Sequence, residues 1–244
     1  MDLVPRWGMK SVRRIVWRKA INTAIFRSAI AEGIGTFILV FAGTGAVMVN
    51  SLGDGVVTHL GISFVFGAVV AALIYTLGHI SGAHLNPAVT LAFWRSGFFP
   101  KHKVLPYILA QSVGAIAAST LLLIALGSVA NLGATQPLND NWLQSLVLET
   151  VLTFILMFVI LGSGLDRRAH IGFAGLAIGL TVGLEAAFMG PITGASMNPA
   201  RSLGPAIVAG IWQHQWVYWV APILGAQLAV IVYRQISNGF SDIQ

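Results

Sequence analysis

Two copies of the tripeptide Asn-Pro-Ala carry the strongest chemical signal in the chain. They consist of Asn86, Pro87 and Ala88, and of Asn198, Pro199 and Ala200. Asparagine is favoured just before a helix and proline at its first position, so one copy alone predicts only a helix start. Each copy opens an apolar segment of about ten residues, which is too short to cross roughly 30 Å of hydrocarbon. The pair therefore predicts two half-helices.

These half-helices would gather hydrogen-bonding groups at the point where they meet. The asparagine side chains could offer N–H donors there, and the positive ends of both helix dipoles would converge. The backbone before each proline is disfavoured from the helical conformation. Its carbonyl groups could therefore face a water path, where irregular backbone survives at membrane depth. The carbonyls predicted to line this path are those of Gly82, Ala83, His84, Gly194, Ala195 and Ser196.

Ionisable residues also interrupt apolar segments, where a lone charge is costly and suggests function. Arg201 follows the second Asn-Pro-Ala box directly. Glu32 and Glu149 occupy matching places in the chain, and this symmetry favours a structural role over a proton relay. Glu185 has no such counterpart. It either binds a solute hydroxyl group or is a buried acceptor, and the buried interpretation is favoured.

The composition indicates a membrane protein. Hydrophobic residues make up 56% of the 244 residues and charged residues only 9%, whereas soluble domains carry about 25% charged residues. Residues 34–49 and 60–77 contain no charge. Cysteine is absent, which excludes a disulfide and a thiolate metal site. We expect no metal at His79 or His84, because no further ligands lie at suitable spacing.

Six membrane-spanning helices are predicted, at residues 29–50, 58–79, 105–127, 143–164, 171–189 and 216–236. A cytoplasmic N-terminus then places every lysine and arginine except Arg201 on the cytoplasmic side, as the positive-inside rule requires. The C-terminus is cytoplasmic in the same arrangement. The plasma membrane is the expected location, or the inner membrane if the source is bacterial.

The chain also repeats itself. The segment at 81–88 returns at 193–200, and Glu32 returns as Glu149, with further landmarks in the same order. An odd number of spans in each half inverts one half relative to the other, and such repeats place their shared site near the bilayer midplane. The predicted fold is an all-α membrane protein with six transmembrane helices and two re-entrant half-helices in an inverted 3+3 repeat.

Two parts of the chain are expected to differ. Residues 1–28 hold seven of the 14 lysines and arginines, interleaved with apolar residues. They predict a basic amphipathic segment on an anionic membrane surface, with a partly disordered basic tail as the alternative. Residues 29–240 form a single channel domain, with one repeat at about 29–127 and the other at about 143–236.

With two Asn-Pro-Ala boxes, the six-plus-two plan and the sequence Asn-Pro-Ala-Arg at 198–201, the chain resembles the aquaporin (major intrinsic protein) family along nearly its whole length. The stretch at 190–208 is most similar to the nodulin-like branch, which includes carriers of glycerol and metalloid acids. The resemblance implies a homotetramer with one pore per subunit. It also implies that Glu32 and Glu149 accept hydrogen bonds from backbone N–H groups of the two broken segments.

The resemblance further implies a narrow filter of four side chains: Phe66, Ala186, Ala195 and Arg201. Arg201 would repel cations and donate to solute oxygen, rather than form an interfacial salt bridge. Ala186 departs from strict water channels, which carry histidine there, and a smaller side chain widens the constriction. Against this, Ser202 stands where glycerol-conducting members have aspartate. We give the filter more weight because it sets the bore directly.

Together these features predict a passive channel for water and small uncharged solutes such as glycerol, closed to protons and ions. An alternative with the same fold is a metalloid-acid channel (arsenite, boric or silicic acid) or an ammonia channel. A weaker alternative is a proton-coupled secondary transporter. The sequence holds no nucleotide loop or nucleophile constellation, so we expect no enzyme, no cofactor and no nucleic-acid partner. The expected partners are water, small neutral solutes and the lipid bilayer.

Overall fold

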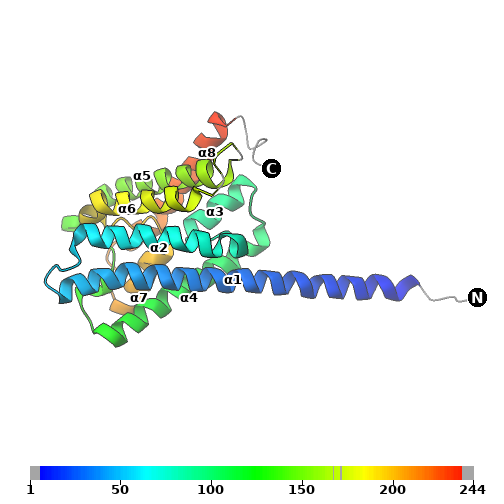
Figure 1. Cartoon of the computed structure of the whole chain (residues 1–244), viewed down its shortest axis with the longest axis horizontal. Helices are drawn as coiled ribbons and strands as arrows, with labels where there is room; N and C mark the ends of the chain where they lie inside the picture. The colour runs from blue at the N-terminus through cyan, green and yellow to red at the C-terminus, as the bar shows by residue number, and fades with distance from the viewer. Residues whose placement is uncertain (1–5, 167, 171, 238–244) are drawn as a thin grey trace, which may run out of the picture.

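The computed structural model describes residues 6–166, 168–170 and 172–237, with side chains from Thr23 onward. No β-strand occurs in these ranges (Figure 1). The long elements are α1 (Arg6–Leu52), α2 (Thr58–Ser81), α3 (Pro87–Ser96), α4 (Lys101–Leu126), α5 (Trp142–Ile160), α6 (Ala174–Thr193), α7 (Pro199–Ala209) and α8 (Val217–Ile236). Three short helices complete the described elements: η1 (Ala130–Gly133), η2 (Leu138–Asp140) and η3 (Leu161–Leu165), which continues α5.

Six of these helices are long and apolar enough to cross a membrane, and the predicted fold is confirmed. They are α1 from Thr23, α2, α4, α5 with η3, α6 and α8. The bounds of two spans differ from the predicted ones by about one turn. Helix α4 begins at Lys101 rather than at 105, directly after the extended Pro100. Helix α6 starts at Ala174 and continues to Thr193, where Gly194 turns into the left-handed region.

The two short helices α3 and α7 are built alike. Pro87 and Pro199 occupy their first positions, where no backbone N–H is needed. They end at Gly97 and Gly210, which adopt the left-handed conformation of a helix C-cap. At 10 and 11 residues they are half as long as the spanning helices.

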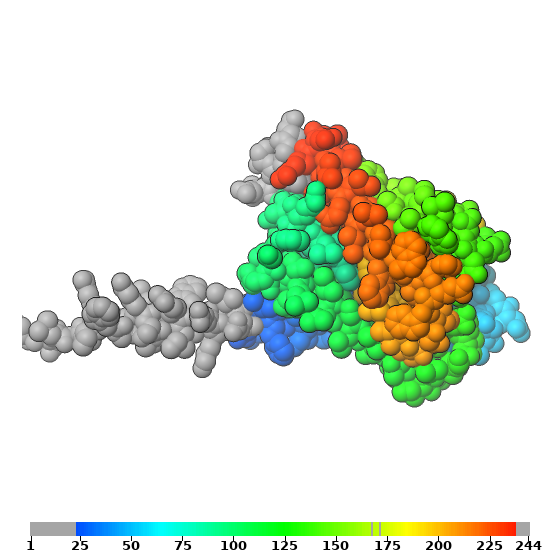
Figure 2. Space-filling view, turned by 180° about the vertical axis from the view of Figure 1, so that it is seen from behind, coloured from blue at the N-terminus to red at the C-terminus, as the bar shows by residue number. Residues whose placement is uncertain are grey.

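The packing of the helices follows the inverted repeat. Helix α1 contacts α4 and α2, and in the other half α5 contacts α8 and α6. Each half-helix packs against the opposite half, α3 on α8 and α7 on α4, and Figure 2 shows both pairs on one face. At the centre, a Cβ atom on Gly67 would lie 2.6 Å from the carbonyl oxygen of Gly179, and a Cβ atom on Gly179 would lie 2.6 Å from that of Gly67. Glycine therefore permits α2 and α6 to cross closely.

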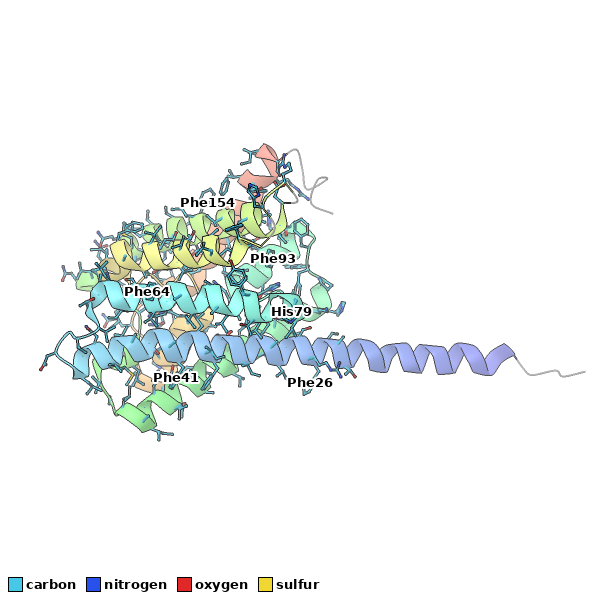
Figure 3. All side chains as sticks on the ribbon, viewed as in Figure 1. Phe26, Phe41, Phe64, His79, Phe93 and Phe154 are labelled. Carbon is cyan, nitrogen blue, oxygen red and sulfur yellow. The ribbon has the colours of Figure 1, made fainter. Side chains whose placement is uncertain are left out.

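Large apolar side chains cover the outside of the bundle. Phe26, Phe41 and Phe64 all point outward (Figure 3), and Phe64 is 72% exposed. Such a surface suits a lipid environment rather than water.

Helix α1 is continuous from Arg6 into its membrane-spanning part. Its N-terminal end lies on the same side of the bundle as the C-terminal end of α8 (Figure 1). The side chains before Thr23 lie outside the described part of the chain. The amphipathic interpretation of residues 1–28 therefore stays a prediction.

Candidate functional site

A cavity of about 620 Å³ runs between the two repeats and brings most of the predicted site residues together. Its lining includes Asn86, Asn198, Phe66, Ala186, Ala195, Arg201, Gly82, Ala83, His84 and Ser196. Gly194 is not part of the lining. Pro87, Ala88, Pro199 and Ala200 are buried behind it and start the half-helices.

The two asparagines cross-link the repeats at the centre of this cavity. Nδ2 of Asn86 donates to the carbonyl oxygen of Met197 at 2.7 Å, and Nδ2 of Asn198 donates to that of Leu85 at 2.8 Å. Each Oδ1 atom accepts from the first turn of its own half-helix, from Ala88 N at 2.8 Å and from Ala200 N at 3.0 Å. Each amide group thus keeps one N–H bond for a molecule in the cavity.

The backbone before each box adopts a conformation that side chains disfavour. Ala83 and Leu85 have φ values of 48° and 53°, and Ala195 and Met197 have 40° and 53°. Non-glycine residues in this left-handed region cost roughly 1–3 kcal/mol each unless the surroundings hold them. The same alternation of backbone conformation occurs in both loops.

Two buried carboxylates hold these N–H groups in place. Glu32 accepts from His84 N at 2.9 Å and from Leu85 N at 2.6 Å. Glu149 accepts from Ser196 N and from Met197 N, both at 2.8 Å. Both glutamates are fully enclosed, and each of their oxygen atoms accepts one backbone N–H group of a pore loop. Through these bonds they hold the strained loops in their conformation, and they are not part of the cavity lining.

The tyrosines that mark the repeat supply a second set of anchors. The hydroxyl group of Tyr107 donates to the Ser81 carbonyl at 2.9 Å, and that of Tyr218 donates to the Thr193 carbonyl at 2.7 Å. Tyr107 and Tyr218 stand 111 residues apart, at equivalent places of the two repeats, and no hydrogen-bonding role was assigned to them from the sequence. Their recurrence at nearly the same distance after each Asn-Pro-Ala box was the signal that could have assigned them this role.

The two halves differ in the side chains beneath the loops. In the first half, Gln111 donates to Glu32 at 2.8 Å and to Thr90 at 3.0 Å. Its counterpart in α8 is Pro222, which has no side-chain donor. Glu149 therefore has one side-chain partner, Thr193 at 2.8 Å.

Arg201 reaches the cavity from the first turn of α7 and is 5% exposed. Its Nη1 atom donates to the Gly133 carbonyl at 2.8 Å, and its guanidinium carbon lies 5.0 Å from the centre of the Phe66 ring. Within the described residues its Nε atom has no hydrogen-bond partner. The loop at η1 was not assigned to the site from the sequence, because it has no motif and no counterpart in the other half.

Glu185 lies on α6 directly before Ala186 and is 2% exposed. Neither of its carboxyl oxygens has a hydrogen-bond partner among the described residues. It is therefore buried, in line with the favoured interpretation, but no protein group described here makes use of it as an acceptor.

His84 is packed among aromatic rings. Its ring lies 4.6 Å from those of Phe93 and Phe99, and its Nδ1 atom lies 3.1 Å from the hydroxyl oxygen of Thr90. In the described ranges no group of three His, Cys, Asp or Glu side chains could hold a metal ion.

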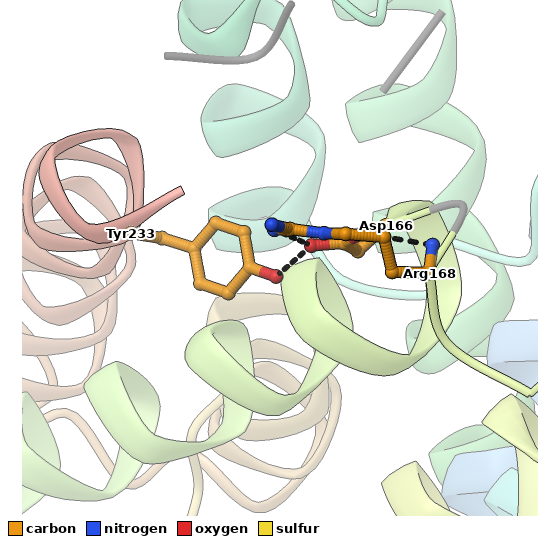
Figure 4. Close-up of polar contacts among 3 residues, drawn as sticks. All are labelled: Asp166, Arg168 and Tyr233. Atoms are coloured by element: carbon orange, nitrogen blue, oxygen red, sulfur yellow. Dashed lines mark hydrogen bonds and ion pairs between the residues drawn. The ribbon is translucent and has the colours of Figure 1, made fainter. Parts of the chain in front are cut away.

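One further cluster lies near the end of the cavity, where Leu165 forms part of the lining. Asp166 accepts from Arg168 Nη2 at 2.6 Å and Nε at 2.9 Å, and from the hydroxyl group of Tyr233 at 2.8 Å (Figure 4). These bonds, led by those from Arg168, lower the pKa of Asp166 below its ordinary value of 3.8. The cluster ties the loop after η3 to α8.

Known proteins resemble this chain along most of its length. The family model "Major intrinsic protein" matches residues 19–233. Aquaporin NIP1-1 of Zea mays is 46% identical over 217 residues, which is 88% of this chain and 77% of that protein. Nodulin-26 of Glycine max is 46% identical over 215 residues, 88% of this chain and 79% of that protein.

A solved structure gives the same answer for the fold. The aquaglyceroporin from Plasmodium falciparum superposes with a TM-score of 0.77 at 25% identity, and the match covers 87% of this chain and 97% of that one. The chain therefore belongs to the major intrinsic protein (aquaporin) family, with similarity to its nodulin-like members.

Proposed function

We propose that this multi-pass membrane protein is a passive channel for water and small uncharged solutes such as glycerol, and that it excludes protons and ions. The observation that carries the proposal is the convergence of both asparagines, Phe66, Ala186 and Arg201 on one cavity. A pathway between the two repeats needs no moving part to admit a molecule smaller than its bore.

The chemistry of the lining supports transport in single file. The free N–H bonds of Asn86 and Asn198 would orient a passing water through its oxygen atom. Carbonyl groups of the two loops would accept its hydrogens on either side. An excess proton would meet the positive ends of α3 and α7 together with the charge on Arg201, which raises its energy at the centre.

The filter supports a solute wider than water. Ala186 and Ala195 both line the cavity, and neither side chain extends beyond one carbon. The space opposite Phe66 therefore suits glycerol. The same two alanines favour a second candidate of the same class, a channel for small neutral metalloid acids.

A proton-coupled transporter receives less support. Such a transporter needs a carboxyl group that can release a proton and move. Glu32 and Glu149 accept hydrogen bonds from two backbone N–H groups each and are fixed by them. Uphill accumulation of a solute driven by a pH gradient would contradict the passive proposal.

The experiment that tests the function is stopped-flow light scattering on proteoliposomes that contain the wild-type chain or Ala186→His. We expect rapid water and glycerol flux in the wild type. The larger side chain should abolish glycerol flux and leave water flux, because it refills the filter. Rapid water flux without glycerol flux in the wild type would make the chain a strict water channel despite Ala186. Absence of both fluxes would refute the channel itself.

Assembly and location follow from the same proposal. A homotetramer with one pore in each subunit is proposed from the family, and cross-linking in membranes would test it. We propose the plasma membrane, or a bacterial inner membrane, as the location, with both termini in the cytoplasm. The common side of the α1 and α8 ends supports this orientation, and the basic segment at 1–28 would lie on that face.

A further inference from the structure

Glu185 is a buried acid without an assigned partner. Its side chain is 2% exposed, and neither carboxyl oxygen bonds to any residue that the structure describes. Enclosing a carboxyl group without hydrogen bonds is costly. An ionisable residue at membrane depth is therefore expected to act on something specific.

Packing does not explain the acid. Gly67 of α2 and Gly179 of α6 contact each other in the same way and are therefore equivalent positions of the two repeats. Equivalent residues of α2 and α6 thus differ by 112 in their numbers. In this register the counterpart of Glu185 in the first repeat is Leu73, a buried core residue at 4% exposure. An apolar side chain thus fills the equivalent place, and the carboxyl group of Glu185 serves something other than helix packing.

Glu185 lies on a helix whose neighbouring residues line the pore. Successive residues of a helix turn by about 100°, so Ala174, Ile178, Val182 and Ala186 span an arc of about 120°. All four line the cavity. Glu185 directly precedes Ala186 in the sequence, and its side chain is enclosed beside the cavity rather than part of the lining.

Among the described residues, the charge that acts on Glu185 has the same sign as its own carboxylate. Glu149 on the neighbouring α5 acts on Glu185 electrostatically. It is itself an acceptor, already engaged with Thr193, Ser196 and Met197. No described protein group is therefore left to bond Glu185, and a small molecule is the remaining kind of partner.

We propose that Glu185 binds a small hydroxyl-bearing molecule, water or a hydroxyl group of the permeating solute, in the wall of the filter beside Ala186. The inference rests on the proposed channel function. Glu185 then acts as a polar determinant of selectivity, since it offers a hydrogen bond at the place where the filter is widest. A solute with several hydroxyl groups gains more from it than water does.

The test compares Glu185→Leu, which copies the first repeat, with Glu185→Gln, which keeps the shape and hydrogen-bonding capacity. Water and glycerol permeability of proteoliposomes are measured at equal protein content, with Leu184→Ala as the control on the lipid-facing side, where Leu184 is 65% exposed. We expect the ratio of glycerol to water permeability to fall about fivefold in Glu185→Leu, the effect of one lost hydrogen bond. Glu185→Gln and the control should keep the wild-type ratio.

An unchanged ratio in Glu185→Leu, with a wild type that conducts both molecules, would overturn the inference and leave the channel function intact. A wild type that conducts neither would refute the function instead.

If Glu185→Leu does not fold, the infrared difference spectrum between wild type and Glu185→Gln decides. A carboxyl band that shifts with added glycerol supports solute binding. One that responds only to hydration supports bound water. A band that responds to neither would overturn the inference.

Discussion

Replacing Glu149 by leucine should weaken the second pore loop by an amount that follows from its hydrogen bonds. The backbone N–H groups of Ser196 and Met197 each lose their acceptor, both now at 2.8 Å. A buried donor without a partner costs about 1–3 kcal/mol, so the free energy of unfolding should fall by about 2–6 kcal/mol. Thr193 can rotate its hydroxyl group and adds little.

The opposite outcome also has a physical rationale. Apolar replacement of buried ionic groups is often neutral or stabilising when the partners are replaced together. Here the partners are backbone groups that no substitution removes. Glu149→Gln keeps one acceptor atom and should therefore lie between wild type and Glu149→Leu.

The assay is thermal unfolding in detergent, together with water permeability in liposomes. Permeability should decrease with stability, because Ala195 and Met197, at φ values of 40° and 53°, are no longer held in their left-handed conformations. Glu185→Leu is the matched control: it removes a buried carboxyl group that leaves no protein donor behind, and it should not lower the unfolding temperature. A Glu149→Leu protein as stable as the wild type would refute the anchoring role of the carboxylate.

Two further outcomes are expected. Arg201→Ala should raise the leak of cations into liposomes by about a hundredfold, as measured with ion-sensitive dyes. The reason is that the repulsion between two unit charges at about 5 Å amounts to about 3 kcal/mol at an effective dielectric constant of about 20. An unchanged leak would assign the exclusion of cations to the helix dipoles alone. Asp166→Asn should lower thermal stability at neutral pH, and since the ion pair lowers the pKa of Asp166 below 3.8, the deficit relative to wild type should shrink as the pH falls below that value. A deficit that is independent of pH would show that the hydrogen bond to Tyr233, rather than the charge, fixes this loop.

The sequence predicted the spans and half-helices because each depends on local properties: the length of an apolar run, and a proline at a helix start. It also predicted that Asn86 and Asn198 meet, because the repeat fixes their symmetry. The exchange of hydrogen bonds with Met197 and Leu85 could not be foreseen, since it depends on the orientation of two loops more than 100 residues apart.

The hydrogen-bond acceptor of Arg201 could not be predicted from the sequence for a related reason. Its acceptor, the carbonyl of Gly133, belongs to the connection between the repeats. That connection has no counterpart in either half and no motif of its own. The left-handed conformations of Leu85 and Met197 could not be predicted either. Glycine is the residue that normally indicates such a conformation, and in these two loops it stands only at Gly82 and Gly194.

The repeat relates the proposed filter to a second set of side chains that differs from it in charge. In the 112-residue register set by Gly67 and Gly179, the four filter positions have four counterparts that all line the same cavity: Ile178, Ile74, Ala83 and Val89. Val89 stands where the second repeat has Arg201, so this mirrored ring carries no charge. An ion would thus lose its hydration at an apolar ring, and a cation would in addition be repelled at the opposite end. A neutral solute would lose only its hydration at the apolar ring. At the end with Arg201 it would form hydrogen bonds again. On the proposed function, we therefore expect discrimination between neutral solutes to depend on the residues around Arg201, where Ala186 would set the width and Glu185 would supply a polar group beside it.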